Sequence, residues 1–319
     1  MPDRSGGMPL PSVQWRCWTP EGVVPKPDSR HGPRMKLERL ATATVFTVAP
    51  GDSLDRAISL MEEHDIHHLP VVGQNRVVGM LSDRDLLLAV GWKLSRERRL
   101  GDDGTLTAGP VLVCEVMSHP VVSLSPENTV RTAAQVMINR RISAVPLTDE
   151  QDRLLGIVTK MDLLTRFHEL TESQPGLSVL RQPATGHMRA NVFTVGPREL
   201  LHVAARRMSE KHIRHLPVVA RGELVGMVTD RDLRRACGEQ TVADELAQAA
   251  GALYFGPSMI WEIMSRNVCT IDPQTRLIDA AGLMAGRRIG ALPVLRDRHM
   301  VGILTDTDIV RAVGQSDES

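Results

Sequence analysis

Four short stretches of the sequence place a serine or threonine three positions before an aspartate. They read SDRD from Ser82, TKMD from Thr159, TDRD from Thr229 and TDTD from Thr305. If each stretch begins a helix, its unpaired backbone N–H groups and the helix dipole favour an anion. A hydroxyl there can donate a hydrogen bond to phosphate, and a carboxylate can accept the two hydroxyls of a ribose. The same spacing also forms a capping box with no ligand, so both interpretations stay open. The four aspartates are Asp85, Asp162, Asp232 and Asp308.

Neither a metal site nor a catalytic site is indicated. His67 and His68 are adjacent on an expected strand, so their side chains point to opposite faces, and no carboxylate or cysteine completes a set with them and His64. The sequence has no GxxxxGK[ST], HExxH or GxSxG motif. Asp83 and Asp85 could hold Mg²⁺ together with a nucleotide, but nothing near them predicts hydrolysis. We therefore expect a protein that is not an enzyme.

The elements that position these stretches belong to an internal repeat. The most similar part of the repeat has two apolar runs, a polar turn between them and the Ser/Thr–Asp stretch at its end. It reads HLPVVGQNRVVGMLSDRDL in the first copy and HLPVVARGELVGMVTDRDL in the third. The second and fourth copies share RISAVP and RIGALP, and the two pairs are offset by the same number of residues. The ancestral unit was therefore a pair of repeats that was later duplicated.

Each repeat predicts strand, helix, strand, strand, helix. The first helix is expected four residues after a proline, and its apolar residues follow i, i+3, i+4, i+7 spacing, as in Leu54, Ala57, Ile58 and Met61. Its methionines are expected in the core. A glycine recurs inside the last strand of every copy, which indicates close approach by a neighbour or a ligand. These glycines are Gly79, Gly156, Gly226 and Gly302.

Composition describes a globular chain with an aliphatic core. Of the 319 residues, 42% are hydrophobic and only 3% aromatic, while Lys plus Arg equals Asp plus Glu at 38 each. Without a basic excess, binding to nucleic acid or to a membrane surface is not expected. The 4 cysteines form no CxxC pair, which argues against a zinc ribbon and a disulfide scaffold. No apolar stretch is long enough to cross a bilayer, and no signal peptide is recognised. We therefore expect a cytoplasmic protein.

The repeats resemble CBS domains, the modules named after cystathionine β-synthase. The resemblance lies in the opening h-h-[ST]-h strand, the hPVV strand and the G-h-h-[ST]-x-x-D element, and it covers most of residues 36–313. It implies an α/β fold in which two repeats pair about a pseudo-twofold axis into a Bateman module, with ligand clefts between the copies. We expect a largely disordered tail at 1–35, modules at 36–168 and 181–313, a linker at 169–180 and a tail at 314–319.

The same resemblance extends to the γ subunit of AMP-activated protein kinase, in which two modules form a disk. We expect each apolar helix face to be buried within its own module, with Met61 against the helices of the paired repeat. We also expect a disk-like association, either within one chain or between two.

The resemblance also implies ligand contacts beyond the Ser/Thr and Asp positions. In the family, the opening strand lines the adenine and phosphate side of the cleft, where ordinary β-propensity is the alternative explanation. The corresponding residues are Thr47, Ser123, Thr194 and Thr270. The IHHLP and IRHLP runs of the first and third copies resemble the IHRLP strand of the kinase subunit, where basic residues approach the phosphates. The second and fourth copies have Ser143 and Gly290 at the basic position, and of these only Ser143 could donate a hydrogen bond. Arginines inside the DRD stretches could instead be solvated or paired with Asp83 or Asp230. The phosphate candidates are His67, His68, Ser143, Arg214, His215, Arg84 and Arg231.

Three functions follow from this resemblance. The leading hypothesis is a regulatory sensor of AMP, ADP or ATP, alone or with Mg²⁺, that changes its conformation or association and acts on a separate effector protein. S-adenosylmethionine or another adenosyl compound is the alternative ligand, and an interaction scaffold with empty clefts is the alternative role. A nucleotide hydrolase is disfavoured because no positioned base or metal set is recognised. No cofactor is expected to be obligatory.

Overall fold

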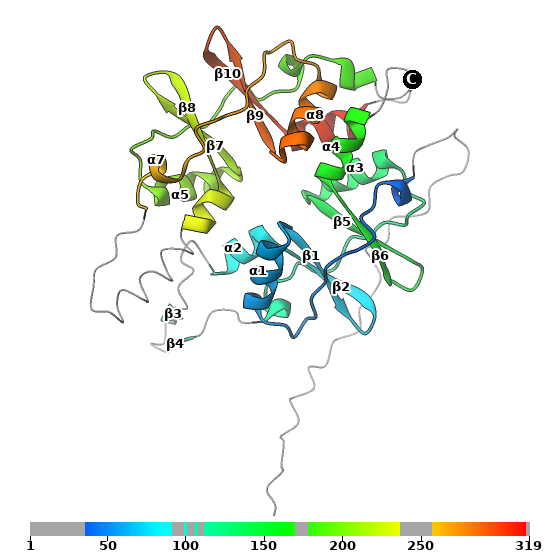
Figure 1. Ribbon diagram of the computed structural model, residues 1–319. Coiled ribbons are helices and arrows are strands. Elements are labelled where there is room, and N and C mark those ends of the chain that lie inside the picture. Colours follow the sequence, from blue (N-terminus) through cyan, green and yellow to red (C-terminus); the bar gives the residue numbers. More distant parts are fainter. Residues whose placement is uncertain are drawn as a thin grey trace, which may run out of the picture.

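Four α/β repeats form a ring around a common centre (Figure 1). The computed structural model describes residues 36–90, 99–100, 106–107, 112–169, 178–236 and 257–316. The tail expected at 1–35 and most of the linker expected at 169–180 lie outside these residues. Around the ring, repeat 1 neighbours repeats 2 and 3, and repeat 4 completes the circle (Figure 1).

Each repeat contains a helix, a two-stranded antiparallel hairpin and a second helix. Repeat 1 comprises α1 (Leu54–Glu63), β1 (His68–Gly73), β2 (Arg76–Ser82) and α2 (Asp83–Val90). Repeat 2 comprises α3 (Val130–Arg140), β5 (Ala144–Thr148), β6 (Leu154–Thr159) and α4 (Lys160–Glu169). Repeat 3 comprises α5 (Leu201–Lys211), β7 (His215–Ala220), β8 (Glu223–Thr229) and a helix described over residues 230–236. Repeat 4 comprises α8 (Leu277–Arg287), β9 (Ala291–Arg296), β10 (His299–Thr305) and α9 (Asp306–Gln315).

Short elements lie between these units. They are the 3-10 turns η1 (Leu37–Arg39), η2 (Val113–Glu115), η3 (Ser178–Arg181) and η4 (Ala184–Gly186), the helix α7 (Ile260–Ile263), and a small hairpin of β3 (Arg99–Leu100) and β4 (Leu106–Thr107). No helix in the described ranges is long and apolar enough to cross a bilayer.

The first helix of every repeat begins at the predicted residue. Ser53 and Thr129 cap α1 and α3 by accepting hydrogen bonds from the backbone N–H groups of Arg56 and Thr132. The methionine of each apolar face is buried, which confirms its place in the core. These methionines are Met61, Met137, Met208 and Met284.

The expected opening strand is shorter than predicted, because it forms a single parallel bridge beside the hairpin. Val48, for example, donates to the Pro70 carbonyl at 3.2 Å and accepts from Val72 N–H at 2.8 Å. The next residue in a position to donate to the hairpin is Pro50, which has no N–H, so the parallel ladder stops. The same bridge followed by proline occurs in all four repeats, at Leu124, Val195 and Ile271 as well.

The segments that lead into the repeats are exchanged within each pair. Residues 36–42, ahead of repeat 1, dock on repeat 2, where Thr42 and Ile157 exchange two backbone hydrogen bonds at 3.0 and 3.1 Å. Residues 112–118, ahead of repeat 2, dock on repeat 1, where Ser118 pairs with Met80 in the same way. Repeats 3 and 4 repeat this exchange. Every hairpin is therefore completed by its partner repeat.

The recurring strand glycines are explained by this exchange. A Cβ atom on Gly156 would lie 3.0 Å from the Thr42 carbonyl oxygen, and one on Gly302 would lie 3.0 Å from the Arg189 carbonyl oxygen. The expected close approach is thus made by the exchanged backbone of the neighbouring repeat. The glycines are required for packing, whether or not a ligand binds.

The hydrophobic core corrects one prediction. Met61 is buried among residues of repeat 1 and the exchanged segment around Val113, and the helices of repeat 2 contribute no residue to that cluster. The helices of repeat 2 instead pack across the module boundary, α3 against α9 and α4 against α8 and α9. Repeats 2 and 4 therefore share one continuous core.

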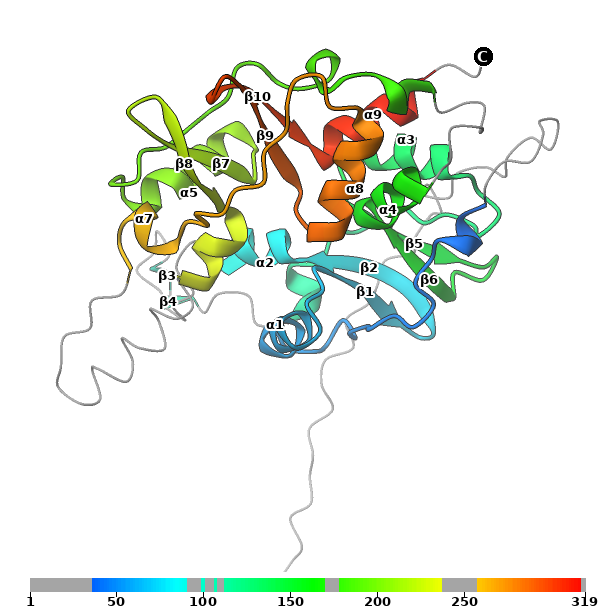
Figure 2. The ribbon, with the colours of Figure 1, turned by 45° about the horizontal axis from the view of Figure 1, so that its top comes forward.

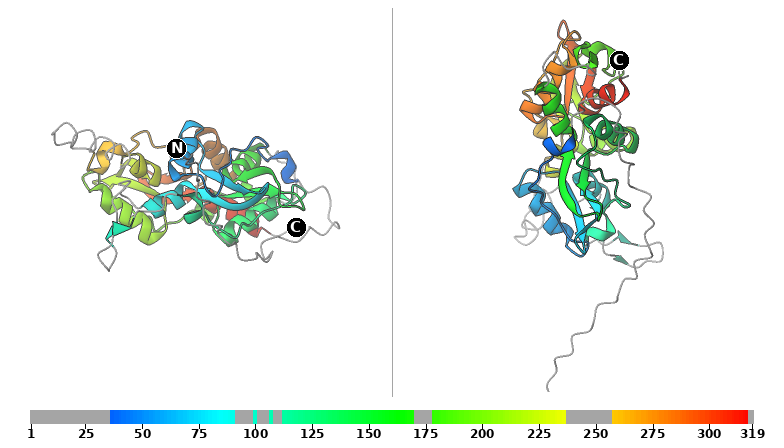
Figure 3. Two further views of the ribbon diagram at one scale, coloured as in Figure 1. Left: turned by 90° about the horizontal axis from the view of Figure 1, so that it is seen from below. Right: turned by 90° about the vertical axis from the view of Figure 1, so that its right-hand side faces the viewer.

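The molecule is flat. The edge-on views show a thin body (Figure 3), and the helices of repeats 2 and 4 pack together (Figure 2). The expected disk is thus formed by the two modules of one chain.

Candidate functional site

All four Ser/Thr–Asp pairs form capping boxes. In each pair the hydroxyl oxygen lies 2.6–2.7 Å from the aspartate Oδ2, and the backbone N–H of the same Ser or Thr donates to that oxygen at 2.7–3.0 Å. The single hydroxyl proton is therefore directed to the carboxylate rather than outward. What distinguishes the four repeats is the second carboxylate oxygen, Oδ1.

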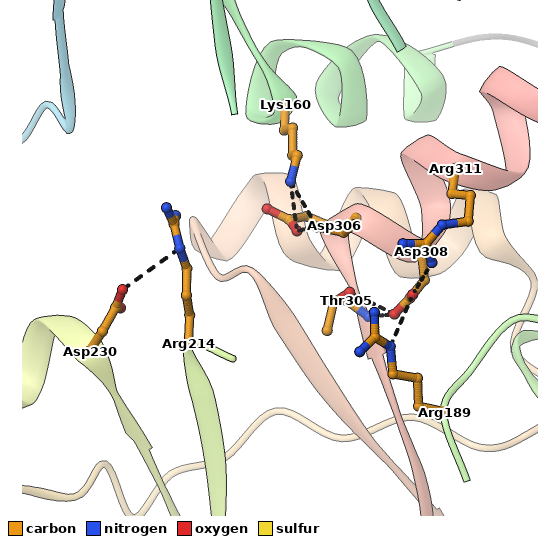
Figure 4. Close-up of polar contacts among 9 residues, drawn as sticks. Lys160, Arg189, Arg214, Asp230, Thr305, Asp306, Asp308 and Arg311 are labelled. Carbon is orange, nitrogen blue, oxygen red and sulfur yellow. Dashed lines mark hydrogen bonds and ion pairs between the residues drawn. The ribbon is translucent and has the colours of Figure 1, made fainter. Parts of the chain in front are cut away.

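Asp308 is the most enclosed of the four aspartates. Its side chain is only 2% exposed, and Oδ1 accepts a hydrogen bond from Arg311 Nη1 at 2.9 Å, with Arg189 Nε 3.6 Å away (Figure 4). Arg189 arrives on the exchanged segment, where Ser118 is its counterpart in repeat 1 and lies 3.4 Å from Asp85 Oδ1. For Asp162 and Asp232, no partner of Oδ1 is found among the described residues, so these oxygens remain available as acceptors.

The basic positions predicted before each hairpin lie next to the starts of the last helices. The backbone N–H of Asp83 donates to the His67 carbonyl at 3.0 Å, and that of Asp230 donates to the Arg214 carbonyl at 3.1 Å. Equivalent bonds join Lys160 to Ser143 and Asp306 to Gly290. In every repeat, folding thus brings the residue that precedes the hairpin next to the Ser/Thr–Asp stretch that begins the last helix, at the centre of the ring.

Charged side chains from all four repeats meet at this centre. Asp83 Oδ2 lies 3.7 Å from His67 Nδ1 and 3.7 Å from Arg231 Nε, which belongs to the other module. Arg214 pairs with Asp230 at 3.7 Å, and Lys160 lies 3.8 Å from Asp306 Oδ1 across the second contact between modules (Figure 4). Lys160 also donates to the Thr307 hydroxyl at 2.7 Å. Arg231 therefore pairs with Asp83 of repeat 1, and not with its sequence neighbour Asp230.

Burial and neighbouring charge set the ionisation of this cluster. Burial lowers the pKa of His68 and of His215 to about 4, so both imidazoles are neutral at pH 7. Burial also lowers the pKa of Lys160 and, together with Arg231, that of His67. Burial acts to raise the pKa of Asp83, but the positive charges around it, Arg214 first, outweigh that effect and hold it below its usual value. For Asp230 burial prevails, and its pKa is raised.

The remaining candidates occupy less uniform surroundings. Thr47, Thr194 and Thr270 are partly exposed, but Ser123 is buried and accepts a hydrogen bond from the Thr148 hydroxyl at 3.1 Å. Arg84 is partly exposed beside Asp83. His215 lies against repeat 4, since a Cβ on Gly290 would be 3.0 Å from its ring, which explains why no larger residue stands there. Among the described residues, no group of three metal-binding side chains lies together.

Lys160 and Asp306 were not identified as site residues from the sequence, and Asp230 was considered only as a partner of an arginine. All three occupy the first position of the last helices, where three copies have an aspartate and one has a lysine, and that change of charge was the available signal. Arg189 gave no signal, because its approach to Asp308 depends on the exchange of segments between repeats 3 and 4.

Comparison with known proteins identifies the repeat. The sequence model of the CBS domain matches at residues 37–91, 113–169, 184–239 and 260–315. The uncharacterised protein MJ1225 of Methanocaldococcus jannaschii is 26% identical over 272 residues, which cover 84% of this chain and 94% of that protein. The CBS domain-containing protein YhcV of Bacillus subtilis is 38% identical over 122 residues, covering 38% of this chain and 78% of YhcV.

Solved structures show the same architecture over most of the chain. The crystal structure of MJ1225, described as a proposed archaeal homologue of g-AMPK, superimposes with a TM-score of 0.72 at 24% identity and covers 87% of this chain and 99% of that one. An uncharacterised conserved protein from Pyrococcus horikoshii gives 0.60 at 20% identity, covering 88% and 100%. The arrangement of four repeats is therefore a fold found in other proteins.

Proposed function

The chain belongs to the CBS domain family, and we propose that it is a regulatory protein that binds an adenine nucleotide, AMP, ADP or ATP. Binding would alter its conformation or its association with a separate effector protein. The proposal involves no reaction, and a phosphate-release assay with ATP is expected to show no turnover above a buffer blank.

The single observation that supports this proposal is the hydrogen bonding of the carboxylates at the helix starts. Asp162 and Asp232 use one oxygen in the cap and have no described partner for the other. A charged acceptor at a helix N-terminus, held in place by its own cap, is suited to the hydroxyls of a ribose. Asp85 has only the 3.4 Å contact from Ser118 at its second oxygen. We infer that repeats 1, 2 and 3 bind ribose through these aspartates.

Repeat 4 is predicted to differ. The second oxygen of Asp308 is bonded to Arg311, and the side chain is 2% exposed. A ribose could reach it only after Arg311 and Arg189 had moved. We therefore propose that Asp308 has a structural role, and that a ligand near repeat 4 would be held by other groups.

Basic side chains at the centre support a ligand that carries phosphate. Arg214 and Arg231 of repeat 3 and Lys160 of repeat 2 meet near the helix starts. Phosphates attached to a ribose in this region would be attracted by these charges. S-adenosylmethionine has no phosphate and carries a net positive charge, so these cations would not attract it, and for this reason AMP, ADP or ATP is proposed ahead of it.

Calorimetric titration with AMP, ADP, ATP and S-adenosylmethionine tests the proposal on wild type, Asp162→Ala, Asp232→Ala and Asp85→Ala. Hydrogen bonds to a charged group are worth about 1.5–3 kcal/mol, so loss of one of these aspartates should weaken binding at its repeat roughly 10- to 100-fold. Loss of the cap alone should lower stability by only ~1 kcal/mol. Thermal melting without ligand separates the two effects.

Asp308→Ala is the matched control. It removes the same cap and should leave nucleotide affinity close to wild type while lowering the melting temperature. Affinities unchanged in the other three variants would contradict the assignment of the ribose sites. If none of the four ligands binds at millimolar concentration, the chain is not an adenosyl sensor.

A further inference from the structure

Asp83 is the most enclosed acidic group at the centre of the ring that lacks a full set of hydrogen bonds. Its side chain is 7% exposed, and its Oδ1 atom is inaccessible to solvent and has no hydrogen-bond partner within the described ranges. The Nδ1 atom of His67 is in the same condition. Buried polar atoms normally have partners, and leaving a carboxylate oxygen without one is costly.

The basic side chains nearest Asp83 are close to it but form no hydrogen bond with it. Oδ2 is 3.7 Å from both His67 Nδ1 and Arg231 Nε, whereas charge-assisted hydrogen bonds are about 2.7–2.9 Å long. Arg214 and His68 also act on its charge, and Asp230 is the neighbouring carboxylate. Asp83 thus offsets the positive charges of Arg214 and Arg231, which belong to the other module, without a short hydrogen bond to Arg231.

The corresponding positions in the other repeats differ. Asp306 is hydrogen-bonded to Thr307 at 2.9 Å and lies near Lys160. Asp230 pairs with Arg214 of its own repeat. Repeat 2 has the cation Lys160 instead of an acid. Among these acids of the described residues, Asp83 alone is both nearly fully buried and paired with a cation of the other module.

We propose that Asp83 is an internal anion that competes with the phosphates of the ligand for Arg231 and Arg214. This inference rests on the proposed function in placing those phosphates at the centre of the ring. Before a phosphate can approach these cations, the Asp83 carboxylate must move away or be outweighed, because like charges in a buried site repel strongly. Asp83 therefore limits how much the phosphates of a ligand add to its binding affinity.

The test compares Asp83→Asn, which keeps the shape and removes the charge, with wild type. Inorganic tripolyphosphate, ATP, AMP and adenosine are titrated into each protein by calorimetry. Removing a competing buried charge should tighten binding of tripolyphosphate and ATP roughly tenfold or more and of AMP by less. Adenosine, which has no phosphate, should bind both proteins equally. Melting curves establish that each variant is folded, and Asp83→Ala is the second variant if Asp83→Asn is not.

Asp297→Asn is the matched control for net charge. Asp297 is exposed in the turn between β9 and β10 and has a φ of 49°, which asparagine tolerates. It should leave all four affinities unchanged. Equal or weaker binding of tripolyphosphate and ATP by the folded Asp83 variants would overturn the proposal, as would an equal gain in Asp297→Asn.

The outcomes also separate this proposal from the sensor function. If adenosine, AMP and ATP fail to bind either protein while tripolyphosphate binds the Asp83 variants more tightly, the competition is supported and the nucleotide function fails. If ATP binds wild type and Asp83→Asn equally well, the nucleotide function survives and the competition is refuted.

Discussion

The contact between repeats 2 and 4 and the contact between repeats 1 and 3 differ in what holds the two modules together, and the exposed ion pair between Arg288 and Asp65 joins repeats 4 and 1. Repeats 2 and 4 meet through helices whose apolar residues merge into one core that includes Phe167 and Val310. Repeats 1 and 3 have separate cores, and the interaction described between them is ionic, from Arg231 to Asp83.

A single position in the last helix illustrates the difference. Two residues after the capping aspartate, repeats 2 and 4 have Leu164 and Val310, both fully buried, whereas repeat 3 has Arg234. An apolar contact of this kind depends little on the charge of a ligand, but a charged contact can be altered by an ionic ligand. We infer that the 2–4 contact holds the disk together and that the 1–3 contact is the side that responds to ligand.

The largest effect is expected from Phe167→Ala. Phe167 is fully buried in the shared core, and truncating a buried phenylalanine costs about 3–5 kcal/mol. Because that core spans both modules, hydrogen exchange should accelerate in α4 and in α8 together. Chemical denaturation gives the stability change, and exchange by mass spectrometry locates it.

The matched control is Leu81→Ala, in the separate core of repeat 1. It should lower stability by about 2–5 kcal/mol but accelerate exchange only in repeat 1 and its exchanged segment. If both variants accelerate hydrogen exchange equally in all four repeats, the proposed difference between the 2–4 and 1–3 contacts is wrong.

The next effect concerns acid. His68 and His215 have pKa values lowered to about 4 in the folded protein, against 6.5 in the unfolded chain. Between these values the unfolded chain binds more protons, so stability falls as pH falls from 6.5 to 4, by at most about 1.4 kcal/mol per pH unit for each histidine. Because both side chains are partly exposed, screening should reduce the total to roughly 1–3 kcal/mol.

This loss should appear first at the starts of β1 and β7 and leave α4 and α8 protected. Denaturation at several pH values, with exchange measured in parallel, checks both statements. The double variant His68→Asn, His215→Asn should show a flatter dependence on pH over this window. A slope identical to wild type in the double variant would show that the two histidines do not cause the effect.

The smallest effect sharpens the description of the 2–4 contact. In α8, Gly282 lies against His168 of α4, whereas Gly286 has open space around it. Gly286→Ala should stabilise the protein by up to ~1 kcal/mol through helix propensity. Gly282→Ala should gain none of this, because the new methyl group forces His168 out of its place. Urea titrations of the two variants measure the difference, and an equal gain at both positions would mean that α4 and α8 are less closely packed than described.

The sequence by itself determined the repeat and its elements. The spacing from proline to helix placed α1, α3, α5 and α8 at their observed first residues, because a helix start and an apolar face depend on local residues. The spacing of the capping residues likewise determined that each last helix would begin with a Ser/Thr–Asp pair. The strand glycines indicated a close approach, although not by which segment.

Only the tertiary structure decided which repeats touch and which charges meet. Arg231 could have paired with its neighbour Asp230, and the fold pairs it with Asp83, 148 positions away in the other module. The four capping aspartates looked equivalent, but the exchanged segment brings Arg189 to Asp308 alone. Both outcomes depend on contacts between residues far apart in the chain, which local spacing does not encode, because the charge and burial of a side chain are set by whatever the fold places beside it.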